Sequence, residues 1–231
     1  MKKCLIYIYL LLLTSLCCLQ AGAVSSEIRS LSVSDGLPDL VINTIYKDSK
    51  GYVWMGTNTS VERFDGIRLE HYMVEGSNEN LKRVFALVEM PDNELWVGTG
   101  MGLFRLADDA EKLERLAPEM ITSGVHAFCK LGDVLYVGTE KGLYVYKRGV
   151  FEHVLVDKNV FSRANFVTGM VEGENGILWL STMGGLKSLR LSDQSITSFS
   201  DKLAKNGQNL SFYNITRIGS KIFMGTMSSG L

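Results

Sequence analysis

Three histidines are the side chains of this 231-residue sequence best suited to acid–base chemistry or metal binding near neutral pH. His71 and His153 occupy the same position in two internal repeats, where Leu113 and Ile196 stand in two others. A position that accepts these residue types is typical of a half-buried strand, so we interpret both histidines as structural. His126 opens an apolar run and, if the internal repeats form a ring, could face the central channel of that ring. No histidine, cysteine or aspartate lies at metal-ligand spacing from it. The sequence predicts no catalytic residue, no metal site and no cofactor.

The acidic residues and the cysteines point to no further chemistry. Acidic clusters fall in predicted turns, where solvated charges are ordinary, and neither a calcium-loop spacing nor a nucleophile-elbow motif occurs. Cys4, Cys17 and Cys18 all precede residue 24, which leaves Cys129 alone in the rest of the chain and excludes an intramolecular disulfide there. Because Cys129 lies in an apolar run, we interpret it as a buried small hydrophobic residue.

A more informative set of polar residues lies in the connections between consecutive repeats. If the repeats form a ring, these connections surround the mouth of its central channel. They carry amide, guanidinium and aromatic groups, a mixture that fits a polar or anionic saccharide or another small polar ligand. The candidate ligand-binding residues are Asn43, Asn80, Arg83, His126, Arg163, Asn165 and Tyr213. Each of them taken alone is also an ordinary loop residue.

These connections are set by a repeat of about 40 to 44 residues. The segment from Gly51 to Gly66 has later copies that begin at Asn93, Asp133, Gly176 and Ser220. The aligned aromatic anchors, separated by 42, 40, 43 and 44 residues, are Trp54, Trp96, Tyr136, Trp179 and Phe223. A repeat of this length that contains an aromatic residue and glycines is typical of a propeller or a solenoid.

Each repeat is typical of four short strands. In the second repeat we expect strands over Val84 to Met90, Leu95 to Thr99, Leu103 to Ala107 and, as a more polar outer strand, Lys112 to Leu116. β-branched and aromatic residues fill the apolar runs, and no helical period is sustained. The sequence predicts an all-β fold, a β-propeller of four-stranded blades with about five blades present. We expect the aromatic anchors to pack between adjacent blades.

The first 23 residues have the features of a secretory signal peptide. Lys2 and Lys3 precede an apolar run over residues 5–16, and small residues at 21–23 fit a cleavage site. The run is shorter than the ~20 residues that span a bilayer. We therefore predict an exported protein whose propeller occupies residues 24–231. A membrane anchor and a lipidated cysteine at position 17 or 18 are the alternatives.

Composition narrows the range of partners. The chain is 46% hydrophobic and 21% charged, as is usual for a globular protein, and its formal charge is −1. No basic patch with interleaved aromatic residues occurs. Neither nucleic acid nor an anionic membrane surface is expected as the main partner of this region.

The repeat signature resembles the two-component regulator propeller repeat. The opening segment Ser32 to Pro38 (SVSDGLP), with Asp48 to Gly51 (DSKG) after it, looks like the first blade of that family's sensor region. The resemblance covers about residues 27–231 and implies a periplasmic sensor of Bacteroides-type bacteria that recognises glycan fragments. It also implies a membrane helix and a histidine kinase further along the chain. For such a sensor we expect a homodimer whose equilibrium the ligand shifts.

The chain departs from that family pattern in two respects. No segment resembles the kinase or the membrane helix, and a seven-bladed ring would need ~290 residues. We expect an incomplete ring in a fragment of a longer protein, the alternatives being closure with few blades or pairing with another chain. The predicted function is non-catalytic ligand sensing. The alternatives are an exported propeller enzyme similar to streptogramin lyases, which would need a channel-facing histidine such as His126 with a metal or acid partner, and a stand-alone interaction scaffold.

Overall fold

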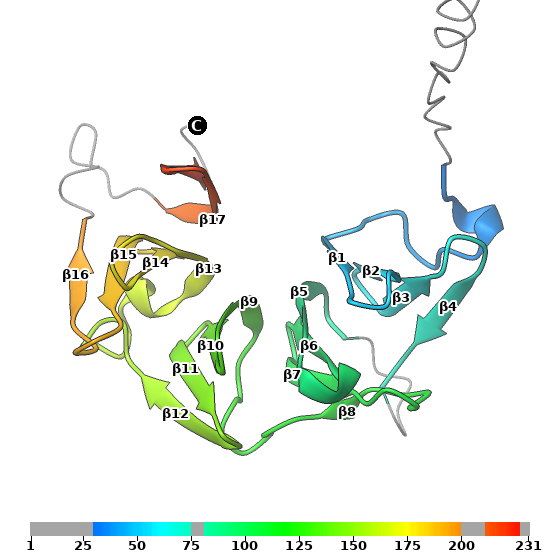
Figure 1. Cartoon of the computed structure of the whole chain (residues 1–231), viewed down its shortest axis with the longest axis horizontal. Helices are drawn as coiled ribbons and strands as arrows, with labels where there is room; N and C mark the ends of the chain where they lie inside the picture. Colours follow the sequence, from blue (N-terminus) through cyan, green and yellow to red (C-terminus); the bar gives the residue numbers. More distant parts are fainter. Residues whose placement is uncertain (1–29, 75–80, 200–210, 227–231) are drawn as a thin grey trace, which may run out of the picture. The chain divides into compact units, whose positions relative to one another are not determined.

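The computed structural model describes residues 30–74, 81–199 and 211–226 (Figure 1). The predicted signal peptide and Asn80 lie outside the described residues. The described regular structure is β-strand, apart from 3₁₀ turns at η2 (Val33–Asp35), η3 (Pro91–Asn93) and η4 (Arg163–Asn165). Within these ranges, no helix has the length and apolar character needed to cross a membrane.

The strands form four four-stranded sheets and one two-stranded sheet. The first sheet contains β1 (Thr44–Lys47), β2 (Val53–Gly56), β3 (Val61–Phe64) and β4 (Leu69–Tyr72). The second contains β5 (Val84–Glu89), β6 (Leu95–Thr99), β7 (Gly102–Leu106) and β8 (Glu114–Arg115). The third contains β9 (Val125–Leu131), β10 (Val134–Thr139), β11 (Gly142–Lys147) and β12 (Val150–Val154). The fourth contains β13 (Val167–Glu172), β14 (Ile177–Thr182), β15 (Gly185–Arg190) and β16 (Ile196–Ser198), and the last pairs β17 (Phe212–Ile218) with β18 (Lys221–Thr226).

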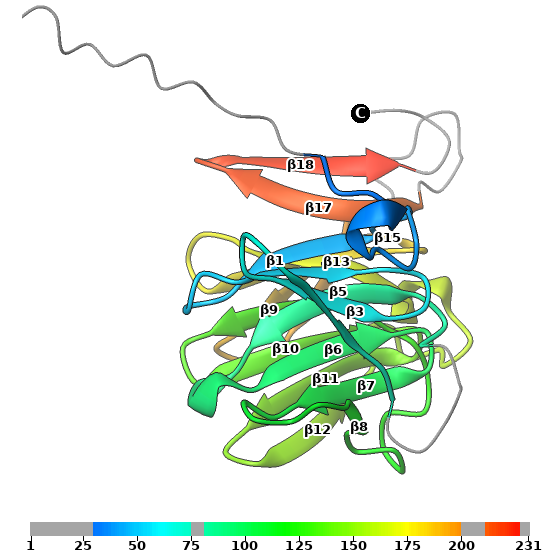
Figure 2. The same cartoon turned by 90° about the vertical axis from the view of Figure 1, so that its right-hand side faces the viewer.

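Each four-stranded sheet is an antiparallel meander in chain order, which confirms the predicted propeller blade. The sheets follow one another around an arc that is open between β1 and β17, so the ring is not closed (Figure 1). The turned view shows the β17–β18 sheet at one edge of the molecule (Figure 2). The inner strands β1, β5, β9, β13 and β17 contact one another in succession. The inner strands thus line the concave side of the arc.

The outer strand of the second sheet is shorter than predicted. We expected a strand over Lys112 to Leu116, whereas β8 contains two residues. Leu113 instead forms a parallel bridge with Val74 of the preceding sheet, and its N–H donates to the Met73 carbonyl at 2.9 Å. The Leu113 N–H is therefore satisfied by the segment that follows β4 and not by β7, with which an extended β8 would pair.

The aromatic residue of each second strand packs against the following sheet. Trp54, Trp96 and Tyr136 are 5%, 3% and 5% exposed, and each belongs to an apolar cluster that joins its own sheet to the next. Trp179 packs in the same way against the β17–β18 sheet. Phe223 is 41% exposed, because no described sheet lies beyond β18. The predicted packing between blades is confirmed for four anchors and is wrong for Phe223.

A glycine in the second strand lets the following sheet approach closely. A Cβ atom added to Gly98 would lie 2.8 Å from Val125 Cγ1 and 2.9 Å from the Val125 carbonyl oxygen. The same contact recurs at two other sheet boundaries, between Gly56 and Val84 and between Gly138 and Val167. A Cβ atom on Gly225 of β18 would meet no described atom within 4 Å. The spacing between sheets therefore depends on the missing side chain of each enclosed glycine.

The hairpin after each second strand is closed by a buried threonine hydroxyl. Thr57 Oγ1 donates to the Ser60 carbonyl at 3.1 Å, and Thr182 Oγ1 donates to the Gly185 carbonyl at 2.6 Å. Thr99 and Thr139 do the same to Gly102 and Gly142. These hairpins carry side chains at the inner ends of the blades, so their closure positions part of the candidate site.

Alanine substitution at two matched glycines tests this packing. Gly98→Ala is expected to lower the free energy of unfolding by ~1–3 kcal/mol, because the methyl group is forced into the Val125 backbone. Gly225→Ala, at the same repeat position without a covering sheet, is expected to stay within ~0.5 kcal/mol of the parent. Urea unfolding of the three proteins measures both values. Equal destabilisation by the two substitutions would contradict the inferred contact.

Candidate functional site

A β-bulge in four of the five inner strands, β5, β9, β13 and β17, turns one residue toward the concave side of the arc. In the β9–β10 ladder, Val125 pairs with Thr139 and Ala127 pairs with Gly138, so His126 is skipped. The same register shift occurs at the matching residue of three other inner strands, namely Phe85 in β5, Thr168 in β13 and Tyr213 in β17. Asn43 stands at the equivalent position before β1. Bulges commonly redirect a side chain beside a functional site, and here they redirect one from each of four sheets.

These side chains line a common cavity of about 520 Å³. Its lining residues are Asn43, Arg83, Phe85, His126, Phe166, Thr168, Met183, Tyr213 and Asn214. The structure therefore brings together four of the predicted candidates, Asn43, Arg83, His126 and Tyr213. The volume lies within the range of ~300–1,000 Å³ that small-molecule sites occupy. We call this set of residues the channel cluster.

An aromatic wall forms the middle of the channel cluster. The His126 ring centroid lies 4.1 Å from that of Phe85 and 4.7 Å from that of Phe166. His126 Nε2 lies 3.2 Å from Glu140 Oε1, in the turn after β10. Burial of the imidazole lowers the pKa of His126, and the hydrogen bond and charge of Glu140 oppose that shift. The ring is therefore mostly neutral at neutral pH and presents an uncharged aromatic surface.

Hydrogen-bonding groups lie beside the aromatic wall. Asn58, in the turn after β2, accepts hydrogen bonds at Oδ1 from Asn43 Nδ2 at 3.2 Å and from Arg83 Nε at 3.4 Å. The Arg83 guanidinium lies 5.8 Å from the Phe85 ring centroid, within cation–π range. Arg83 has a φ of 73°, which is rare for a long side chain. A strained conformation that holds a cation over an aromatic ring is a feature of binding sites.

The remaining predicted residues have other surroundings. Asn165 is 1% exposed; its Oδ1 accepts from the Asp157 N–H, and its Nδ2 donates to the carbonyls of Asp157 and Asn159. The amide is thus used to hold the loop before β13, and its assignment to ligand binding is corrected to a structural role. Arg163 Nη2 donates to Ser211 Oγ at 3.3 Å, near the channel cluster but outside its lining.

Sequence reasoning missed the apolar members of the channel cluster. Phe85, Phe166 and Met183 carry apolar side chains, whereas the residues predicted to bind a ligand all carry polar groups. A usable signal was present, since Phe85 and Thr168 occupy the same repeat position as Asn43, His126 and Tyr213. Thr168 is less available to a ligand, because its hydroxyl already contacts Ser181 and the Phe212 carbonyl.

The other two histidines lie on outer strands, as predicted, but are more exposed than expected. His71 Nδ1 lies 2.8 Å from Oε1 of Glu62, a fully buried carboxylate whose Oε2 has no hydrogen-bond partner among the described residues. The His153 ring stacks on Tyr144 at 4.6 Å, and its Nε2 lies 2.8 Å from the Lys141 carbonyl. Both imidazoles therefore serve local structure.

Cys129 and the acidic groups offer little reactive chemistry. Cys129 is half-buried rather than fully buried, and burial raises the pKa of its thiol to about 11. The thiol is therefore protonated at neutral pH and is a weak nucleophile. Across residues 30–74, 81–199 and 211–226, no three histidine, cysteine, aspartate or glutamate side chains gather where they could hold a metal ion.

The fold and the channel cluster define an open β-propeller domain, and comparison with known proteins places it more closely. Residues 36–59 match the family model of the two component regulator propeller, which confirms the resemblance seen in the sequence. The extracellular domain of the hybrid two component system BT3049 from B. thetaiotaomicron is similar, with a TM-score of 0.70 and 22% identity over 86% of this chain and 29% of that chain. That of BT4673 from the same organism has a TM-score of 0.68 and 21% identity over 80% and 25%.

This chain therefore spans 25–29% of the length of those extracellular domains. Other propellers are also similar: a streptogramin B lyase has a TM-score of 0.64 and 15% identity over 87% of this chain and 66% of that chain. The comparison with curated proteins found no match. At these identities the solved structures establish the shared fold. The protein is a propeller domain that resembles the extracellular domains of hybrid two component sensors.

The lowered pKa of His126 predicts acid-dependent loss of stability. The unfolded chain takes up a proton near the ordinary histidine pKa of ~6.5, whereas the folded protein does so at lower pH. The free energy of unfolding should therefore fall as the pH drops through that interval. His126→Phe keeps an aromatic ring beside Phe85 and removes the proton. Urea unfolding at pH 7.5 and 5.5 should show a smaller loss for the variant; an unchanged loss would contradict the assignment.

Proposed function

We propose that this chain is the ligand-sensing propeller of an exported two component sensor, and that it recognises a glycan fragment in the channel cluster without catalysing a reaction. The carrying observation is the convergence of an aromatic wall with amide and guanidinium groups in one cavity. Sugar rings present apolar faces that stack on aromatic side chains and hydroxyl groups that bond to amides. Both elements are present within the channel cluster.

The compartment and the partner belong to the same proposal. The predicted signal peptide at residues 1–23 would direct the chain to the periplasm. The similar solved structures are extracellular domains, which supports that location. A homodimer would relay ligand binding to membrane-spanning segments further along the chain. For this the ligand must bind one of the two conformational states of the dimer more tightly than the other.

The arginine offers a sharp test of channel binding. A panel of neutral and uronic-acid-containing oligosaccharides is titrated into the purified chain by calorimetry. For a saccharide that binds, Arg83→Asn should weaken affinity about tenfold or more, because a charge-assisted hydrogen bond is lost. Asparagine tolerates positive φ, so this variant should stay folded.

Two further variants complete this test. Phe85→Ala should weaken binding of the same saccharide about twofold to tenfold through loss of the ring contact. Arg68→Asn, in the exposed turn after β3, is the matched control and should bind like the parent. If no saccharide in the panel binds, or if Arg83→Asn and Phe85→Ala leave binding unchanged, the glycan proposal fails.

One contact favours a second candidate, a propeller-fold lyase. His126 and Glu140 form the histidine–acid pair in the channel that such chemistry needs, and a streptogramin B lyase shares the fold. A neutral imidazole held by a carboxylate could act as a general base. If this candidate holds, incubation with a streptogramin B should yield a product that His126→Phe no longer forms. Absence of product with the parent protein would exclude it.

A further inference from the structure

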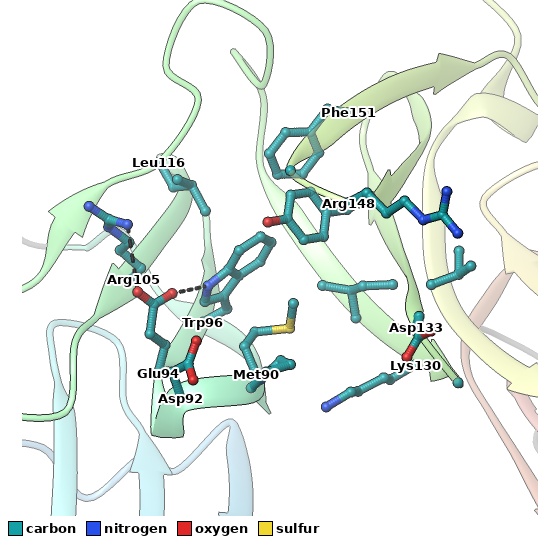
Figure 3. A pocket seen from close by; sticks show the side chains of 16 residues that line it. Met90, Asp92, Glu94, Trp96, Arg105, Leu116, Lys130, Asp133, Arg148 and Phe151 are labelled. Carbon is teal, nitrogen blue, oxygen red and sulfur yellow. Dashed lines mark hydrogen bonds and ion pairs between the residues drawn. The ribbon is translucent and has the colours of Figure 1, made fainter.

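A second cavity, separate from the channel cluster, opens between the second and third sheets (Figure 3). It has a volume of about 660 Å³ and lies where the β5–β6, β9–β10 and β11–β12 turns meet. Its buried apolar surface comes from Met90, Trp96 and Leu135. The half-buried rings of Tyr146 and Phe151 continue that surface, with centroids 4.8 and 5.9 Å from Trp96. We call this cavity the inter-sheet crevice.

The repeat supplies an internal reference, because the same place between the first and second sheets is closed. The corresponding space there has a volume of about 20 Å³. Arg63 fills it, with its guanidinium 4.7 Å from the Tyr52 ring centroid and 5.5 Å from that of Trp54. In the inter-sheet crevice Arg105 replaces Arg63, and Glu94 replaces Tyr52. Arg105 therefore pairs with Glu94 and Glu114 rather than lying across the rings.

Two polar links across the closed space have no counterpart in the crevice. In the closed space, Glu89 accepts hydrogen bonds from the Ser49 N–H and hydroxyl at 2.9 and 2.7 Å. The equivalent residues in the crevice are Lys130 and Pro91, and proline has no N–H to donate. The closed space is also bridged by the ion pair of Lys50 with Asp108. Across the crevice, Lys130 Nζ donates to the Glu89 backbone carbonyl at 3.1 Å, and among the described residues no ion pair joins the second and third sheets there.

At the two crevice positions equivalent to Lys50 and Asp108, the signs of the charges are reversed. Asp92 stands where Lys50 stands in the first sheet, and Arg148 stands where Asp108 stands in the second. Among the described residues, neither Asp92 nor Arg148 forms an ion pair or a side-chain hydrogen bond. The second sheet therefore contributes an unpaired carboxylate at Asp92, and the third sheet contributes the unpaired Arg148 guanidinium, with Lys130 and Asp133 also in the lining. The apolar interior lies between these opposite charges (Figure 3).

We propose that the inter-sheet crevice binds an amphipathic zwitterion of about the size of an apolar dipeptide. The ligand's ammonium group lies at Asp92, its carboxylate lies at Arg148, and its apolar side chains lie against Trp96, Tyr146 and Phe151. The ligand thereby supplies the charge pairing that Lys50 and Asp108 make within the protein at the closed space. The aromatic interior and the volume fit a ligand of this class.

The experiment uses leucyl-phenylalanine as the probe, titrated into the purified chain by calorimetry. The same dipeptide with an acetylated N-terminus and an amidated C-terminus is the matched probe without charges. The free dipeptide should bind, and the blocked one should bind at least tenfold more weakly. Asp92→Asn and Arg148→Asn should each weaken binding of the free dipeptide about tenfold. Both residues have positive φ, which asparagine tolerates, so thermal unfolding should stay close to that of the parent.

A closure variant and a cross-control complete the test. Asp92→Lys combined with Arg148→Asp copies the Lys50–Asp108 pair and should abolish dipeptide binding while the protein stays folded. Arg83→Asn, which changes the channel cluster, should leave dipeptide binding intact, and Arg148→Asn should leave saccharide binding intact. Failure of one proposal is therefore distinguishable from failure of the other. The proposal is overturned if the parent does not bind the free dipeptide, or if the blocked dipeptide binds equally well.

Discussion

The close contact between a glycine in one sheet and a valine in the next is the constraint on which the structure depends. At Gly98, any side chain would meet the Val125 backbone within 3 Å, so the two sheets lie as near as their main chains allow. The aromatic anchor on the same strand then fills the space that remains between them. Because dense packing leaves little freedom in such an interface, repetition of this contact fixes how each blade follows the last.

The two candidate sites arise at opposite ends of this repeated interface. On the concave side, the bulge in each of β5, β9, β13 and β17 points one side chain inward, and the repeat leaves the identity of that side chain unconstrained. Between sheets, residues of the strands and turns either close the space, as Arg63 of β3 and the Lys50–Asp108 pair do, or leave it open. The scaffold residues therefore recur, whereas the residues that meet a ligand vary from blade to blade.

Much of the fold could be predicted from the sequence, because a periodic pattern reports local structure directly. The strand over Leu95–Thr99 coincides with the prediction, and the anchors fall on the second strand of every sheet. The prediction for β8 was too long because a contact with the preceding sheet, through Leu113 and Val74, competes with the local pattern. The aromatic type of Phe223 correctly predicted its place on a second strand. The burial of its side chain, however, depends on a following sheet.

The candidate site could be predicted only in part. Asn43, Arg83, His126 and Tyr213 were recognisable because the connections between repeats, which carry them, surround the channel mouth of a propeller. Whether Asn165 faces a ligand or its own loop depends on hydrogen bonds that form only after folding.

By itself, the sequence determined the all-β class, the four-stranded unit and the side of the blades on which polar residues gather, since these follow from periodicity. Only the tertiary structure decided that Phe85 and Phe166 flank His126 and that one inter-sheet space is open while its neighbour is closed. The physical reason is that both features depend on distances between side chains of different sheets, and sequence spacing does not encode those distances.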